Sequence, residues 1–301
     1  MLSLTDVADA KHHGDASLIS PQTGYRSIQV RSEASLESWN AMILCIDVGN
    51  SQTTAGVYDQ TGTLQAHWQM ATDLSHTSDE LKEKLLFSMN VAGLPSSSIQ
   101  AVAIACVVPL LNRRWNQVAV DLTGDGACFV DASQPEFLDF AVPYPQTIGA
   151  DRIANALAAK LLYGVPVIVV DLGTATDMEV VDKNGAFAGG IIMPGLMLSA
   201  QALFSKAAKL SSIQIAPPSR SLGTTTEESM QSGLVLGTAC AIDGLVERIE
   251  EELSIPDAVV VATGGLCQLV APSCTTVQRI NDHLTLDGIY WFYMKQAIRE
   301  C

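Results

Sequence analysis

Two stretches of the chain decide its fold class: residues 43–62, ILCIDVGNSQTTAGVYDQTG, and residues 167–185, VIVVDLGTATDMEVVDKNG. Each begins with four apolar residues and continues with Asp-x-Gly, a short polar loop, a second strand pattern and an Asp-x-x-Gly turn. The aspartates that end the first strands, Asp47 and Asp171, lie 124 residues apart. A β-hairpin repeated at this distance indicates a duplicated α/β domain.

The segments around each copy extend the repeat. A third strand pattern follows at residues 63–71 and at 186–194, and a further apolar strand at 101–108 and at 258–262. We therefore predict an α/β protein with two similar domains, residues 42–156 and 157–301, that face each other across a cleft. Residues 1–41 are polar, without apolar periodicity, and are predicted to form a flexible N-terminal extension.

Charge and hydropathy exclude several classes of function. Seventeen Lys and Arg against 32 Asp and Glu give a net charge of -15, which repels a nucleic-acid backbone. The longest apolar runs, 101–111 and 165–170, are shorter than the roughly 18 to 20 residues of a membrane span. With neither an export leader nor a transit peptide at the N-terminus, a cytoplasmic enzyme without membrane or nucleic-acid partners is expected.

The loops of the two hairpins have the composition of phosphate-binding loops. In each, the aspartate ends a buried strand and the glycine lets the backbone turn, so that the following amides can face an anion. Residues 47–54 and 171–176 contain no Lys or Arg, so a metal ion would have to neutralise the phosphates, and Asp47 and Asp171 are placed to hold it. One copy alone could equally be an ordinary turn formed by Asp and Gly.

Two further glycine elements accompany these loops. Gly264 and Gly265 directly follow the strand pattern at 258–262, where a glycine pair allows close approach of a nucleoside, although a plain helix-entry turn is as good a reading. Gly149-Ala150-Asp151-Arg152 precedes a run of good helix formers, so it opens a helix whose N-terminus favours an anion. Asp151 alone could simply complement the helix dipole.

These elements resemble the phosphate-1, phosphate-2 and adenosine motifs of the superfamily of acetate kinase, sugar kinases, heat-shock chaperones and actin. Within it, the chain is most similar to type III pantothenate kinases over about residues 42–298. The matching motifs, in order, are Asp47–Thr54, Gly149–Arg152, Asp171–Thr176, Pro194–Leu196, Thr226–Gly233, Thr263–Leu266 and Leu284–Gly288. The resemblance implies two ribonuclease H-like domains, the actin-like ATPase duplication, with ATP in the cleft. It also implies transfer of phosphate from ATP to pantothenate, the first step of coenzyme A biosynthesis.

The resemblance assigns roles to individual residues. Asp151 is the expected catalytic base, accepting the proton of the primary hydroxyl of pantothenate. Asp47 orients Mg²⁺, directly or through water, and Asp171 holds a monovalent cation, K⁺ or NH₄⁺. The expected ATP-binding residues are Asp47, Val48, Gly49, Asn50, Ser51, Gln52, Thr53, Thr54, Thr174, Gly264 and Gly265. The expected pantothenate-binding residues are Tyr144, Gly149, Ala150, Asp151, Arg152 and Thr226.

Alternatives stay open at three of these points. Thr226 lies beside two capping-box patterns, Thr225-x-x-Glu228 and Thr224-x-x-Glu227, and Tyr144 fits plain packing equally well. Three glycines follow Thr226, at 233, 237 and 244, and need a close neighbour that either a partner subunit of the expected homodimer or another helix of the same domain could provide.

The chain departs from the family at residues 177–179. The family usually continues with Thr-Phe-Asp after the second phosphate loop, whereas this chain has Asp177-Met178-Glu179. The added carboxylate could repel ATP, recruit a further cation, or point away from the loop and be neutral. It motivates an alternative function, a catalytically weak or inactive regulatory homologue, while a kinase for another small molecule is a third possibility.

Overall fold

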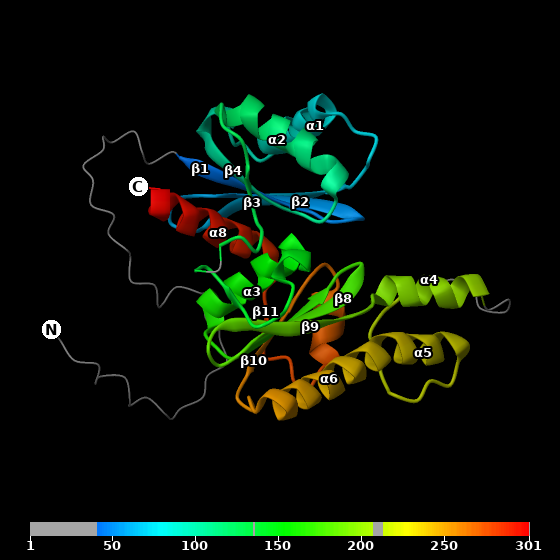
Figure 1. Cartoon of the computed structure of the whole chain (residues 1–301). Helices are drawn as coiled ribbons and strands as arrows, with labels where there is room; N and C mark the ends of the chain where they lie inside the picture. The colour runs from blue at the N-terminus through cyan, green and yellow to red at the C-terminus, as the bar shows by residue number, and fades with distance from the viewer. Residues whose placement is uncertain (1–40, 135, 207–212, 301) are drawn as a thin grey trace, which may run out of the picture. The chain divides into compact units, whose positions relative to one another are not determined.

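The computed structural model describes residues 41–134, 136–206 and 213–300. The predicted extension at 1–41 lies outside this range except for its last residue. Two mixed β-sheets form the framework (Figure 1). The strands of the first sheet, in spatial order, are β3 (Leu64–Ala71), β2 (Gln52–Tyr58), β1 (Met42–Val48), β4 (Ile99–Cys106) and β5 (Cys128–Phe129). Those of the second are β11 (Arg279–Ile280), β10 (Val259–Thr263), β7 (Val167–Leu172), β8 (Ala175–Val181), β9 (Ala186–Pro194) and β6 (Asp139–Phe140).

The two sheets repeat one topology, so the predicted duplication is confirmed. The order β3-β2-β1-β4-β5 corresponds to β9-β8-β7-β10-β11, with antiparallel pairs in the hairpins and parallel pairs beyond. Both predicted Asp-x-x-Gly turns close with a hydrogen bond from the glycine amide, Gly62 to Asp59 and Gly185 to Asp182. The short strand β6 extends the second sheet beyond the repeat by pairing parallel with β9.

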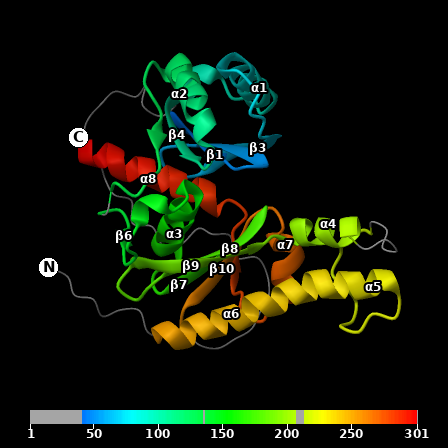
Figure 2. The same cartoon turned by 45° about the vertical axis from the view of Figure 1, so that its right-hand side comes forward.

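The helices form three sets. Those packed on one face of the first sheet are α1 (Ser78–Val91) and α2 (Pro109–Thr123). Those that share the apolar cluster of both sheets are α3 (Ala150–Tyr163) and α8 (Leu284–Glu300). Those on the other face of the second sheet are α4 (Leu196–Lys206), α5 (Thr226–Gln231), α6 (Gly237–Leu253) and α7 (Cys267–Val270). The short 3₁₀ helices are η2 (Ser96–Ser98), η3 (Pro145–Thr147) and η5 (Ala271–Ser273), and η4 (Ser232–Leu236) is a π-helix between α5 and α6. Figures 1 and 2 both place α3 and α8 between the two sheets.

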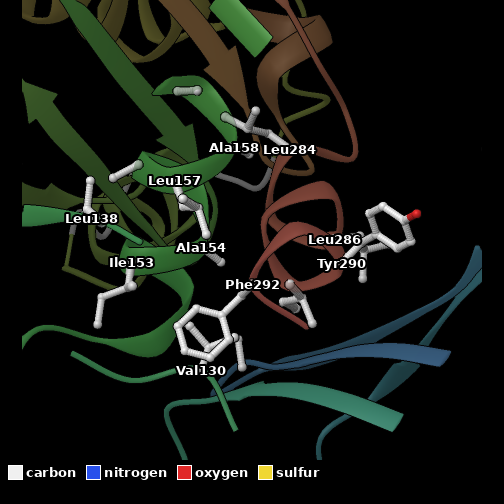
Figure 3. Packing of buried hydrophobic residues seen from close by; sticks show 14 of the residues in the cluster. Val130, Leu138, Ile153, Ala154, Leu157, Ala158, Leu284, Leu286, Tyr290 and Phe292 are labelled. Carbon is white, nitrogen blue, oxygen red and sulfur yellow. The ribbon is translucent and has the colours of Figure 1, made fainter. Parts of the chain in front are cut away.

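Helix α3 is apolar on nearly all sides because it lies in this central layer. Every residue from Ile153 to Ala159 is buried, as expected for a helix without a solvent face. Figure 3 shows α3 beside α8, with side chains of both helices directed into one cluster. The last helix also binds the first sheet: the Tyr58 hydroxyl donates to Asp287 Oδ1 at 2.7 Å, and the Tyr58 ring stacks on Tyr290 at 5.0 Å.

The helix that follows Thr226 meets a length and composition test for a membrane span. The segment Thr226–Leu253, which comprises α5, η4 and α6, is apolar over an 18-residue window, of which 33% is buried. Core helices of soluble proteins pass the same test, and Ala239, Ile242 and Val246 of α6 belong to the core of the second sheet.

The crossing of α3 and α8 depends on Gly288. A Cβ at this position would lie 2.0 Å from the carbonyl oxygen of Ala154 and 2.4 Å from its carbonyl carbon. The Gly288→Ala substitution is therefore expected to lower the free energy of unfolding by about 2 kcal/mol or more, because backbone cannot move aside as a flexible side chain can. Urea denaturation measures this change.

The control is Glu83→Ala on the exposed face of α1. This change is expected to alter the free energy of unfolding by less than about 0.5 kcal/mol. Equal effects of the two substitutions would contradict the assignment of Gly288 to a close helix contact.

Candidate active site

The two phosphate-type loops lie next to each other. The first follows β1, where the Gly49 amide donates to the Gln52 carbonyl at 3.0 Å. The second follows β7 and has the matching bond, from the Gly173 amide to the Ala175 carbonyl at 3.0 Å. The Thr174 hydroxyl donates to Ser51 Oγ at 3.1 Å, so the structure joins two predicted ATP-binding residues that are 123 positions apart in the chain.

The remaining predicted residues of the first loop differ in exposure. Asn50, Ser51 and Gln52 are exposed, whereas Val48 and Thr53 are buried. Thr54 pairs with Asp47 across β1 and β2, and directly paired residues of antiparallel strands share a face of the sheet. The loop therefore presents its tip, rather than its strand residues, to solvent.

Asp47 lies at the end of β1. One of its carboxylate oxygens has no hydrogen-bond partner in the described part of the protein. Its Oδ1 atom is buried and accepts no hydrogen bond within the described residues. Burial, together with the charges of Asp151 and Asp171, raises its pKa well above the ordinary value. A bound cation would satisfy this oxygen and reverse the shift, so the residue fits the predicted metal role.

Asp171 is held by a polar chain that sequence analysis did not identify. Its Oδ2 atom accepts from Asn155 Nδ2 of α3 at 2.9 Å, and Asn155 Oδ1 accepts from the Thr285 hydroxyl of α8 at 2.8 Å. Asn155 is only 1% exposed. The signal available in the sequence was an asparagine among the apolar residues of a predicted helix. Thr285 lies within the Leu284–Gly288 motif already noted.

Gly264 fits closely against Asp171. It has φ +88°, and a Cβ there would lie 2.4 Å from Asp171 Oδ1, so only glycine is compatible with both the conformation and the space. A Cβ at Gly265 would instead meet nothing within 4 Å. Gly264 thus packs directly against the second loop, whereas space remains beside Gly265.

Asp151 is in the first turn of α3, with Gly149 as N-cap, as predicted. The Arg152 amide donates to Asp151 Oδ1 at 2.7 Å. Burial raises the pKa of Asp151, although this hydrogen bond and the Arg152 charge oppose the shift. A carboxylate in this position is oriented by its own helix, and a raised pKa makes it a stronger base.

Arg152 is engaged inside the protein. Its Nε atom donates to Glu179 Oε1 at 2.8 Å, and Nη2 donates to the Met178 carbonyl at 3.3 Å. Gly190 provides the space, because a Cβ there would lie 2.1 Å from Nη2. Glu179 is fully buried, and sequence analysis did not identify it as the partner of Arg152. The geometry makes Arg152 part of a buried ion pair at the base of the site.

Asp177 points to the same side as Asp171. The two residues are directly paired across β7 and β8, so their side chains lie on the same face of the sheet. Burial raises the pKa of Asp177, with Arg152 opposing and Asp151 adding to the shift. Asp177 therefore adds negative charge beside the second loop.

The charges of the site are unbalanced without a ligand. The carboxylates of Asp47, Asp151, Asp171, Asp177 and Glu179 interact electrostatically with one another, and Arg152 is the cation that pairs with them among the described residues. Within the described ranges, no three His, Cys, Asp or Glu side chains form a complete metal site. A cation bound here would need additional ligands, such as phosphate oxygens or water.

Tyr144 and Thr226 differ in their surroundings. Tyr144 is 66% exposed. Thr226 is the first residue of α5, capped by a box between Thr225 and Glu228, the first of the two predicted patterns. It lines a hollow of about 700 Å³ that shares no lining residue with the hollow of about 610 Å³ beside Gly149.

Comparisons with known proteins identify the family. Residues 43–248 match the family model described as type III pantothenate kinase. The chain is 40% identical over 252 residues to the type III pantothenate kinase of Exiguobacterium sibiricum, covering 84% of this chain and 98% of that protein. The protein belongs to the type III pantothenate kinase family. Another type III pantothenate kinase, from Listeria monocytogenes, is 39% identical over 254 residues, or 84% of this chain and 97% of its own.

Solved structures confirm the fold of this family member. The activator of 2-hydroxyisocaproyl-CoA dehydratase from Clostridium difficile, solved with bound ADPNP, superposes with a TM-score of 0.54 at 12% identity, covering 86% of this chain and 98% of that one. The ethanolamine utilization protein EutJ from Carboxydothermus hydrogenoformans gives a TM-score of 0.50 at 15% identity, with 83% and 89% covered. The predicted actin-like ATPase fold is thus confirmed.

The charge imbalance predicts a pH dependence of stability. Burial raises the pKa of Asp171 to about 6, and the charges of Asp151 and Asp177 add to the shift. Between pH about 4 and 6 the folded state therefore binds more protons than the unfolded state, so the free energy of unfolding falls as pH rises through this window. Asp171→Asn is expected to stabilise the ligand-free protein at pH 8 by about 1 to 3 kcal/mol and to flatten this pH profile.

Urea denaturation at pH 5 and pH 8 measures both effects. The exposed residue Asp125 provides the control: Asp125→Asn is expected to change stability by less than about 0.5 kcal/mol at either pH. A loss of stability at pH 8 in Asp171→Asn would show that the carboxylate is not strained in the ligand-free protein.

Proposed function

We propose that this chain transfers the γ-phosphoryl group of ATP to the primary hydroxyl of pantothenate, forming 4′-phosphopantothenate at the first step of coenzyme A biosynthesis. The observation that carries the proposal is the convergence of Asp47, Asp151 and Asp171 on one site beside two joined phosphate-type loops. Family membership supports the substrate pair.

Asp151 is the proposed acceptor of the hydroxyl proton. The Arg152 amide donates to one carboxylate oxygen and so restrains the orientation of the group. Phosphoryl transfer has a loose transition state, so most of the effect comes from positioning the attacking oxygen and less from removing its proton. The Arg152–Glu179 ion pair supports this role by holding the first turn of α3 on β8.

The carboxylates of Asp47 and Asp171 are the proposed cation ligands. We assign Mg²⁺ to Asp47, directly or through water, and a monovalent cation, K⁺ or NH₄⁺, to Asp171. Such cations, when bound, neutralise charge on the transferred phosphoryl group. The chain's own contribution is to keep the two carboxylates apart on separate strands while Asn155 holds Asp171 in place.

ATP is proposed to contact the tips of both loops, Gly49–Gln52 and Thr174, and the space beside Gly264 and Gly265. Backbone amides replace basic side chains here, because neither loop carries Lys or Arg. The two lobes that enclose the nucleotide are residues 42–156 and 157–301, and the enzyme is proposed to act in the cytoplasm.

Thr226 is proposed to reach the acceptor of a partner subunit in a homodimer. A Cβ at Gly233, Gly237 or Gly244 would meet nothing within 4 Å in the described part of this chain. Exposed apolar side chains lie nearby, including Leu222 at 80% and Met197 at 51% exposure. A second copy packing on this face would cover both features, which no described part of this chain covers.

The first test is pantothenate-dependent release of ADP. Asp151→Asn is expected to lower kcat by about 10² to 10⁴-fold while ATP still binds, because the neutral amide keeps the shape and loses the charge that positions the hydroxyl and accepts its proton. Asp125→Asn is the control and should retain wild-type kcat. A wild-type protein that binds ATP without turnover would overturn the proposed activity and favour the regulatory alternative, with Asp177 the first residue to replace by Thr.

A second test addresses the shared site. Asp151→Asn and Thr226→Ala proteins are each expected to be nearly inactive, and an equimolar mixture allowed to exchange subunits should recover about one quarter of wild-type activity, since each mixed dimer contains one intact site. Sites completed within a single subunit would give no recovery. Subunit exchange is verified with differently tagged copies.

A further inference from the structure

A hollow of about 610 Å³ opens beside the Gly149 motif. It lies between the end of β4, the first turn of α2, the segment after β5 and the start of α3. Its lining includes Cys106, Val107, Asn112, Val130, Gly149 and Ala150. Asp131 is also in the lining, and no lysine or arginine is among the described residues that line it.

The hollow adjoins the catalytic carboxylate. A Cβ at Gly149 would lie 2.4 Å from Asp151 Oδ1 and 3.4 Å from Val107 Cγ1. The lining residue Gly149 therefore lies close to both Asp151 and Val107. Cys106, at the end of β4, is within electrostatic range of Asp47 and Asp151. A substrate whose hydroxyl reaches Asp151 can thus extend its next atoms into this hollow.

Asn112 is the one lining side chain with an unsatisfied buried amide oxygen. Its Oδ1 atom has no hydrogen-bond partner within the described residues. One turn later on the same helix, Asn116 Oδ1 accepts from the Ala127 amide at 3.0 Å, which is the ordinary structural use of such a group. An unpaired buried acceptor costs about 1 to 3 kcal/mol of folding free energy. This oxygen is therefore suited to accept a hydrogen bond from a bound ligand.

We propose that Asn112 is a specificity-determining residue that accepts a hydrogen bond from the acceptor substrate. This inference rests on the proposed function. Pantothenate carries two donors close to its reacting hydroxyl, a secondary hydroxyl and an amide N–H, and both are uncharged. The uncharged part of pantothenate suits this hollow. Its carboxylate stays outside, because Asp131 would repel it and no described lining residue is basic.

Asn112→Ala tests the proposal. The KM for pantothenate is expected to rise about tenfold, while kcat and the KM for ATP stay within about twofold, because the bond is made equally in ground and transition states. Asn90→Ala removes an exposed asparagine from α1 and should leave all three constants unchanged. The unfolding free energy of Asn112→Ala should not fall, since the substitution removes an unpaired group.

Two substrate analogues identify the donor. One lacks the secondary hydroxyl and the other carries an N-methyl group on the amide. The analogue that lacks the donor should lose about tenfold in kcat/KM with wild type and lose nothing further with Asn112→Ala. Equal losses of both analogues in both proteins, or an unchanged KM in Asn112→Ala, would overturn the assignment.

A binding measurement distinguishes a wrong assignment of Asn112 from a wrong proposed function. If wild type gives no pantothenate-dependent ADP, the shift of Tm on adding pantothenate tests Asn112 directly. A shift in wild type that is lost in Asn112→Ala supports the binding role without the reaction. Equal shifts, or none in wild type, reject it.

Discussion

The close contact between α3 and α8 is the constraint on which the site depends. Gly288 lies against the backbone of Ala154, and beside this crossing Thr285 donates to Asn155, which in turn donates to Asp171. Helix α8 is also fixed to the first sheet through Tyr58 and Asp287. One helix crossing thus connects the first sheet to the carboxylate that ends β7 on the second sheet. A side chain at residue 288 would separate the helices and release this polar chain.

The fold holds several mutually repelling carboxylates together in the site. Asp47, Asp151, Asp171 and Asp177 are brought to the ends of strands and a helix, where burial and mutual charge raise their pKa values. Arg152, the cation beside them, is already paired with Glu179. Ligand-free protein therefore carries a destabilising cluster that cations and ATP can relieve, which is the physical reason for such a site to bind them.

Sequence patterns predicted the fold well where the physics is local. The alternation of the hairpins, their Asp-x-x-Gly turns and the helix opened by Gly149 depend on neighbouring residues, and the structure confirms them. The direction of Asp177 depends on strand register, which pairs it with Asp171, and the sequence left three readings open. The partners of Arg152 and Asp171 were missed because Glu179 and Asn155 approach them from other elements.

The sequence by itself determined the duplicated α/β framework, the two acidic loops without basic residues and the family, since these follow from periodicity, turn chemistry and ordered motifs. Only the tertiary structure decided which carboxylates converge, which cation is already paired and where space remains beside Asp151. Burial, distance and unsatisfied hydrogen bonds, as at Asn112, arise from contacts between segments far apart in the chain, and no local pattern encodes them.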